Sequence, residues 1–168
     1  MDFRALYDAH FAFVWRNLRR LGVREADLPD ALQDVFIVVH RKLAEFEGRS
    51  KITTWLFAIC LRVAADRRKA ARHATKEEPF CDRTHALSVA PSAHETAECV
   101  EGLLGILPIE QRVVFVMFEL EGFSGDEIAE ALAIPVGTVR SRLRLARDAF
   151  CIAIAQLTES TRLLASPP

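Results

Sequence analysis

Almost every periodic stretch of this 168-residue chain repeats its apolar residues at intervals of three and four, the spacing of one face of an α-helix. Such stripes predict helices over residues 2–21, 28–46, 54–73, 95–107, 109–122, 126–132 and 136–156. No segment alternates polar and apolar residues as a half-buried strand does. The pattern therefore predicts an all-α fold.

One segment, residues 74–94, interrupts this periodicity. It contains Pro79 and Pro91 among scattered Ser, Thr and charged residues, a composition typical of a linker. We therefore expect two small helical domains, residues 1–73 and 95–157, joined by a flexible linker. The last residues, 158–168, are expected to form a short tail.

The composition excludes several classes of protein. Hydrophobic residues make up 51% and charged residues 27%, which is typical of a folded chain rather than a disordered one. No apolar run reaches the roughly 18 residues that span a bilayer, and the first residues do not resemble a secretory signal. We therefore expect a cytoplasmic protein without membrane insertion. Its cysteines are expected to be reduced thiols: Cys60, Cys81, Cys99 and Cys151.

The formal net charge of −1 hides an uneven distribution. Residues 62–73 carry a net charge of +4 and residues 137–150 carry +3, whereas residues 95–130 carry −8. Compact basic segments in a neutral chain indicate localised contact with a polyanion. Of the 22 basic residues 18 are Arg, which makes bidentate contacts with phosphate and guanine, although codon composition alone would produce the same bias.

Residues 123–150 have the sequence form of a helix-turn-helix. A capping box at Ser124-Gly125-Asp126-Glu127 begins a short helix, Pro135 follows in a tight turn, and a basic helix comes next. The apolar face of that helix is Val139, Leu143, Ala146 and Phe150. An arginine face alone would more often be merely solvated, but its combination with the capping box and turn favours DNA binding.

Two sets of motifs resemble one family. Residues 128–147, preceded by Leu107-Pro108 and Gln111-Arg112, closely resemble the C-terminal region of extracytoplasmic-function sigma factors of bacterial RNA polymerase. Residues 30–36 resemble the "D-x-x-Q-[ED]-x-F" core of region two in the same family, and residues 54–59 resemble its "TWLxxI". The resemblance covers about residues 3–72 and 96–155.

The resemblance implies a function for each part of the chain. One helix would dock on the β′ clamp of core RNA polymerase through Asp30, Gln33 and Asp34. The following loop and helix would capture a flipped base and bind phosphates of the minus-ten element, through Phe46, Arg49, Ser50, Lys51, Thr54, Trp55, Arg62, Arg67, Arg68 and Arg72. The last helix would read the minus-thirty-five element, through Thr138, Arg140, Ser141, Arg142, Arg144 and Arg147.

The same resemblance implies two further partners, the polymerase β flap and an anti-sigma factor. The sequence shows no Gly-rich phosphate loop, no nucleophile–base pairing and no close metal set, so we expect neither a cofactor nor an enzyme. Two alternatives stay open: an autonomous helix-turn-helix transcription regulator, and a helical protein-binding adaptor with solvated basic segments. The spacing of Trp55 with Ile59 and Val63 favours a core role for this side chain over a stacking role.

Three positions depart from the family pattern. Arg62 stands where Asn is common, His40 where an aromatic residue is common, and Ala133 where the turn commonly has Gly. A left-handed conformation at Ala133 would cost about 1 kcal/mol. A loose set of His and Cys residues is too irregularly spaced to predict a zinc site: His73, Cys81, His85, His94 and Cys99.

Overall fold

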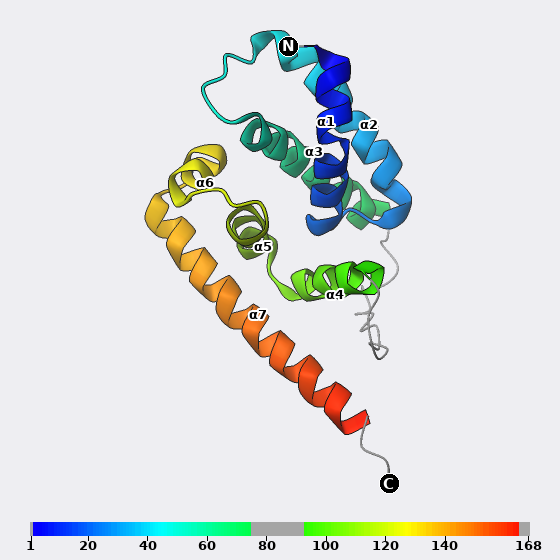
Figure 1. Cartoon of the computed structure of the whole chain (residues 1–168), viewed down its shortest axis with the longest axis vertical. Helices are drawn as coiled ribbons and strands as arrows, with labels where there is room; N and C mark the ends of the chain where they lie inside the picture. The colour runs from blue at the N-terminus through cyan, green and yellow to red at the C-terminus, as the bar shows by residue number, and fades with distance from the viewer. Residues whose placement is uncertain (1, 75–92, 165–168) are drawn as a thin grey trace.

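The computed structural model describes residues 2–74 and 93–164, and the side chains of residues 2–71 and 99–158. All regular structure in these ranges is helical, which confirms the all-α prediction. The helices form two groups, α1 to α3 and α4 to α7 (Figure 1). Within the described ranges, no helix is both long and apolar enough to cross a membrane.

The first group consists of α1 (Phe3–Arg20), α2 (Leu28–Lys42) and α3 (Ile52–Ala74). Asp2 caps α1 by accepting hydrogen bonds from the amides of Arg4 and Ala5. Pro29 lies in the first turn of α2, where its missing amide proton costs nothing. The three helices bury their apolar stripes against one another, and the largest fully buried side chain is Phe57 of α3.

The second group consists of α4 (Ala93–Ile106), α5 (Ile109–Phe115), α6 (Gly125–Leu132) and α7 (Val136–Leu164). The predicted capping box begins α6: the Ser124 hydroxyl accepts from the Glu127 amide at 3.2 Å, and the Ser124 amide donates to the Glu127 carboxylate at 2.8 Å. The helix predicted at residues 109–122 is α5 followed by a π-helical turn at Val116–Leu120. This turn is directly followed by Glu121.

The two groups of helices pack together, which the sequence did not predict. Their buried residues form one continuous hydrophobic cluster, in which Phe57 and Phe123 meet edge to face at 6.0 Å. Figure 1 shows α6 beside the N-terminal end of α3. Four ion pairs among the described residues also cross this interface: Arg16–Glu121 at 3.7 Å, Arg19–Glu101 at 2.9 Å, Arg20–Glu121 at 2.6 Å and Lys51–Glu127 at 2.9 Å.

Candidate nucleic-acid and protein interfaces

The apolar face of α7 fixes the orientation of its arginines. Val139, Leu143 and Ala146 are buried, with exposed fractions of 1%, 6% and 0%. Phe150 is half-buried and its ring lies 4.8 Å from that of Phe115. These four residues are the ones predicted to face inward, and their burial turns the opposite, arginine-bearing face of α7 outward.

The six α7 residues predicted to read DNA differ in whether another residue of the chain already binds their side chains. Arg142 is half-buried and donates to Glu110 at 2.8 Å, and Arg147 donates to Glu119 at 2.6 Å. Arg140 and Arg144 are exposed, the latter 3.9 Å from Asp148. The remaining two residues, Thr138 and Ser141, are joined by a hydrogen bond in which the Ser141 hydroxyl donates to the Thr138 backbone carbonyl at 3.0 Å. Arg140 and Arg144 are therefore the side chains best placed to reach a ligand.

The turn between α6 and α7 adopts the left-handed conformation that the sequence left undecided. Ala133 has φ 51° and ψ 46°. Its amide donates to the Glu130 carbonyl at 3.2 Å, and the Ile134 amide donates to the Ala129 carbonyl at 3.1 Å. This pattern satisfies the last carbonyls of α6 as a glycine-ended helix would, with alanine in the strained position.

The loop before α3 forms a depression of about 250 Å³ lined by six residues. They are Glu45, Phe46, Glu47, Arg49, Ser50 and Trp55. The rings of Phe46 and Trp55 lie 5.1 Å apart, and Trp55 is half-buried, so it both packs on the core and borders the depression. Four predicted minus-ten residues therefore share one concave site. Thr54 differs, because it is 95% buried and its hydroxyl oxygen is inaccessible to solvent.

The arginines of α3 are less available than their sequence predicts. Arg62 is exposed, and none of the ion pairs among the described residues includes it. Arg67 donates from both Nε and a terminal nitrogen to Asp34 on α2. Arg68 donates to the Leu21 carbonyl. The side chain of Arg72 lies outside the described residues.

The three residues predicted to dock on polymerase lie along α2. Asp30 and Asp34 are one helical turn apart, and their side chains are 73% and 45% exposed. Both carboxylates flank Arg67, whose pKa is raised chiefly by its hydrogen bond to Asp34. Gln33 is exposed on a neighbouring face of the helix. An acidic strip of α2 is thus accessible, with one guanidinium already bound to it.

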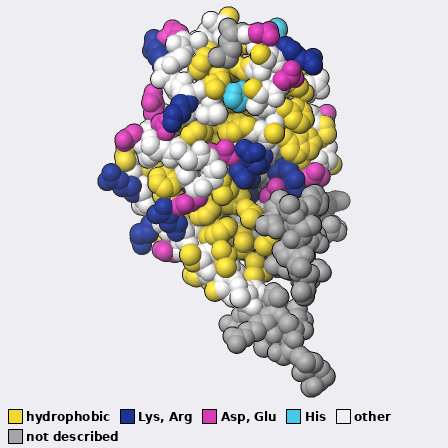
Figure 2. Space-filling view, viewed as in Figure 1, with side chains coloured by type: hydrophobic (Ala, Val, Ile, Leu, Met, Phe, Trp, Pro, Cys, Tyr) yellow, Lys and Arg dark blue, Asp and Glu magenta, His cyan; other side chains and the backbone are white. Residues whose placement is uncertain are grey.

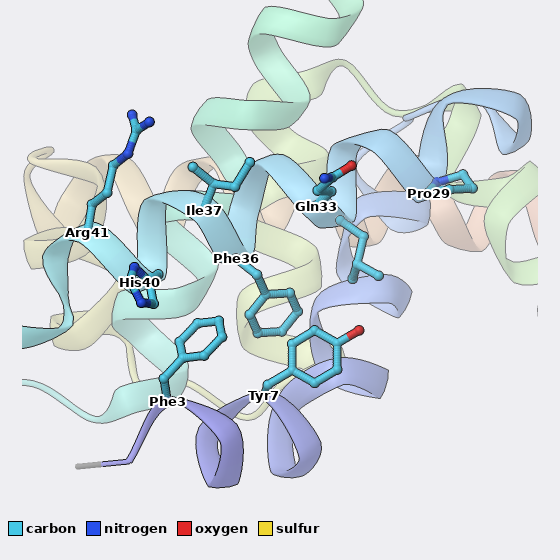
Figure 3. Close-up of a pocket in the computed structure, with 9 residues that line it drawn as sticks. Phe3, Tyr7, Pro29, Gln33, Phe36, Ile37, His40 and Arg41 are labelled. Atoms are coloured by element: carbon cyan, nitrogen blue, oxygen red, sulfur yellow. The ribbon is translucent and has the colours of Figure 1, made fainter.

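Gln33 also borders a groove between α1 and α2 that the sequence analysis missed (Figure 3). The groove has a volume of about 510 Å³, and its floor is aromatic. The rings of Tyr7 and Phe36 lie 4.5 Å apart, and His40 meets Phe3 edge to face at 5.0 Å. Both helices place these residues four apart, a signal that could have revealed the groove. His40 thus makes a ring contact at the position where the family has an aromatic residue.

Charges of both signs are mixed on the surface. On the face in Figure 2, Lys and Arg side chains lie in separate groups with Asp and Glu beside them.

Burial raises the pKa of the Cys60 thiol to about 12, so this cysteine stays protonated at neutral pH. Among the described residues, no three His, Cys, Asp or Glu side chains are grouped to hold a metal ion. Four members of the irregular His/Cys set lie outside the described side chains, namely His73, Cys81, His85 and His94.

Comparison with known families agrees with this layout. Residues 6–74 match the family described as Sigma-70 region 2, and residues 97–150 match Sigma-70, region 4. The first match covers α1 to α3 and the second covers the helix-turn-helix. A protein with both parts is of the sigma-70 class, the promoter-specificity subunits of bacterial RNA polymerase.

Two relatives show to which subgroup of the sigma-70 class the chain belongs. The chain is 33% identical over 150 residues to the ECF RNA polymerase sigma factor SigM of Mycobacterium tuberculosis, covering 86% of this chain and 73% of the relative. It is 34% identical over 142 residues to the ECF RNA polymerase sigma-E factor of Escherichia coli K12, covering 76% and 74%. The chain belongs to the ECF sigma factors, and its function is that of an RNA polymerase sigma factor.

Solved structures share the fold along nearly the whole chain. A structure of CnrH in complex with the cytosolic domain of CnrY has a TM-score of 0.68 at 25% identity, covering 92% of this chain and 88% of CnrH. The sigma factor RpoE of Bartonella quintana, in complex with the anti-sigma factor NepR, has a TM-score of 0.74 at 18% identity, covering 94% and 97%. Sigma factors in general are not enzymes. The comparisons do not favour the two alternatives, an autonomous helix-turn-helix regulator and a helical protein-binding adaptor.

Proposed function

We propose that residues 1–73 form the polymerase-docking and minus-ten domain of this sigma factor and that residues 95–157 form its minus-thirty-five domain. The observation that carries the proposal is the division of α7 into a buried apolar face and an outward arginine face within a helix-turn-helix. That arrangement presents Arg140 and Arg144 to the major groove, where a guanidinium makes bidentate bonds to guanine.

The first domain supports the minus-ten role through the depression beside Trp55. An aromatic wall with Ser50 and Arg49 at its edge offers stacking and hydrogen-bond donors to an extruded base. Arg62 lies about two turns further along the helix that carries Trp55, α3, and would bind phosphate. The exposed carboxylates of Asp30 and Asp34 give α2 the acidic surface that a basic clamp helix of the polymerase would meet.

We further propose that an anti-sigma factor binds this chain and that the chain acts in the cytoplasm with the β′ clamp and β flap of core polymerase. The sigma factor RpoE, which has the same fold, is seen in complex with the anti-sigma factor NepR, and CnrH, which also has this fold, is seen in complex with the cytosolic domain of CnrY. Residues 95–130 carry a net charge of −8, and among their described acids Asp126 and Glu130 have no ion pair within the chain and would face a protein partner. No cofactor or metal is part of this proposal.

In-vitro transcription with core polymerase and a candidate promoter tests the proposal. Addition of this chain should confer specific initiation, and core polymerase alone should not initiate at that promoter. Tight operator binding by the isolated chain, without polymerase-dependent initiation, would instead identify an autonomous regulator. Asp34→Asn should weaken polymerase binding, whereas Asp8→Asn on the exposed surface of α1 should leave it unchanged and serves as the matched control.

A further inference from the structure

The acidic surface of α2 and the basic surface of α3 are joined by Arg67. Both Nε and one terminal nitrogen of Arg67 donate to the same oxygen of Asp34, with the Nε contact at 3.1 Å. A terminal nitrogen also lies 4.0 Å from Asp30. One guanidinium proposed to bind promoter phosphate is therefore held by the two carboxylates proposed to bind polymerase.

The pair with Asp34 limits what Arg67 can bind. Two of its five N–H donors are used on Asp34, and the nearby negative charges of Asp30 and Asp34 repel a phosphate that approaches the remaining donors. A partner arginine that binds Asp34 through both carboxylate oxygens would likewise need the position that Arg67 holds. Asp34 is 45% exposed and Arg67 is 29% exposed, so an incoming side chain can reach the pair without unfolding the bundle.

We propose that Arg67 is an intramolecular competitor for the polymerase-docking carboxylate, released to promoter phosphate when an arginine of core polymerase binds Asp34. Arg67 is thus a positioning residue for docking and a contact residue for DNA. Since the same release serves both ligands, docking on polymerase increases the affinity of α3 for DNA, and DNA increases the affinity for polymerase by the same factor. This inference rests on the proposed docking role of Asp34.

Arg62 provides a matched control on the same helix. It is an exposed arginine of α3, also proposed to bind phosphate, and none of the described ion pairs includes it. Replacing either arginine removes one promoter contact, but only replacement of Arg67 removes a competitor from Asp34.

The test measures the affinity of the full-length chain for core polymerase without DNA, by competition against a fluorescently labelled wild-type chain. Arg67→Gln should bind core polymerase roughly two- to fivefold more tightly than wild type, the range expected for losing a partly exposed ion pair. Arg62→Gln should bind it as wild type does, and Arg67→Lys should fall between. Misfolding cannot explain a gain in affinity.

A second measurement concerns promoter binding by the assembled holoenzyme. Arg67→Gln and Arg62→Gln should each reduce the slope of log affinity against log salt by about one unit. Polymerase affinity of Arg67→Gln equal to or weaker than wild type overturns the competition, and an unchanged salt slope overturns the release to DNA. If Asp34→Asn leaves polymerase affinity unchanged, the docking role itself fails; if that variant binds weakly while Arg67→Gln shows no gain, only the competition fails.

Discussion

Ala133 is the one non-glycine residue with a positive φ among the described residues. An L-residue with a Cβ is strained there, and glycine is not. Ala133→Gly should therefore raise the free energy of unfolding by up to about 1 kcal/mol, because the relieved strain of about 1–2 kcal/mol exceeds the extra chain entropy of glycine, about 0.4–1 kcal/mol. Chemical denaturation of the two proteins measures the difference.

The same substitution inside a helix provides the control. Ala9 is exposed in the middle of α1, so Ala9→Gly should lower the free energy of unfolding by about 0.5–1 kcal/mol. Opposite signs for the two variants would show that backbone conformation decides the effect. A loss of stability in Ala133→Gly would contradict the left-handed turn.

Glu127 titrates far from its ordinary range. The bond from Lys51 is the largest cause that lowers its pKa from 4.5 to about 2, followed by the bonds from Ser124. Because the pKa is lower in the folded protein, these interactions stabilise the fold fully above about pH 4.5, and that stabilisation is lost as the pH falls toward 2. Lys51→Met should raise the pKa of Glu127, yet leave it below 4.5 because Ser124 still donates.

An NMR titration of the Glu127 side chain between pH 2 and 6 measures this shift. Lys42→Met serves as the control, since Lys42 is exposed at the end of α2 and should not influence Glu127. An unchanged pKa in Lys51→Met would show that Lys51 does not face Glu127 in solution.

At the scale of the element, the arginines of α7 should contribute unequally to recognition of the upstream promoter element. Arg140→Ala and Arg144→Ala should each cost roughly 1–3 kcal/mol of discrimination at one or two base pairs of the upstream element. Arg142→Ala should cost less, because Arg142 is bound to Glu110. Transcription by the holoenzyme from a set of upstream-element variants measures these differences. Equal losses at all three positions would contradict the assignment.

The helices themselves could be predicted because each has one buried stripe of three-and-four spacing. The α6 capping box and the inward face of α7 followed from neighbouring residues alone. The π-helical turn at Val116–Leu120 could not be predicted, since its residues fit an α-helix equally well by composition. Helix α7 also runs to Leu164 rather than to the predicted residue 156, because no helix-breaking residue stands between them.

At the scale of the whole molecule, the packing of the two helix groups against each other could not be predicted from patterns in the sequence. Arg20 and Glu121 are 101 residues apart in the chain, and nothing local to either residue indicates the other. For the same reason the sequence could place Arg67 and Asp34 in two sites but could not show that they bind each other. Side-chain type predicted what each residue can bind, whereas the tertiary fold decided which partner it has.

The Arg20–Glu121 pair should stabilise the packed arrangement. Glu121 is 7% exposed and Arg20 is 17% exposed, and burial lowers the pKa of Arg20. Glu121→Ala leaves a desolvated guanidinium without its partner and should cost about 2–3 kcal/mol of unfolding free energy. Arg4→Ala, which breaks the exposed Arg4–Asp8 pair, should cost at most about 0.5 kcal/mol. Thermal unfolding would contradict this contrast if both variants melted alike.

Lys51 beside the minus-ten depression and Glu127 of the helix-turn-helix lie only 2.9 Å apart. Under the proposed function, their two domains read sites separated by roughly 25 base pairs, or about 85 Å at 3.4 Å per base pair. The two domains must therefore separate at this interface before one molecule can bind both sites. If closure is favoured by about 2 kcal/mol, roughly 3% of free molecules are open, and the apparent promoter affinity falls about thirtyfold. The strength of an internal contact thereby sets how many copies of the protein are ready to span a promoter.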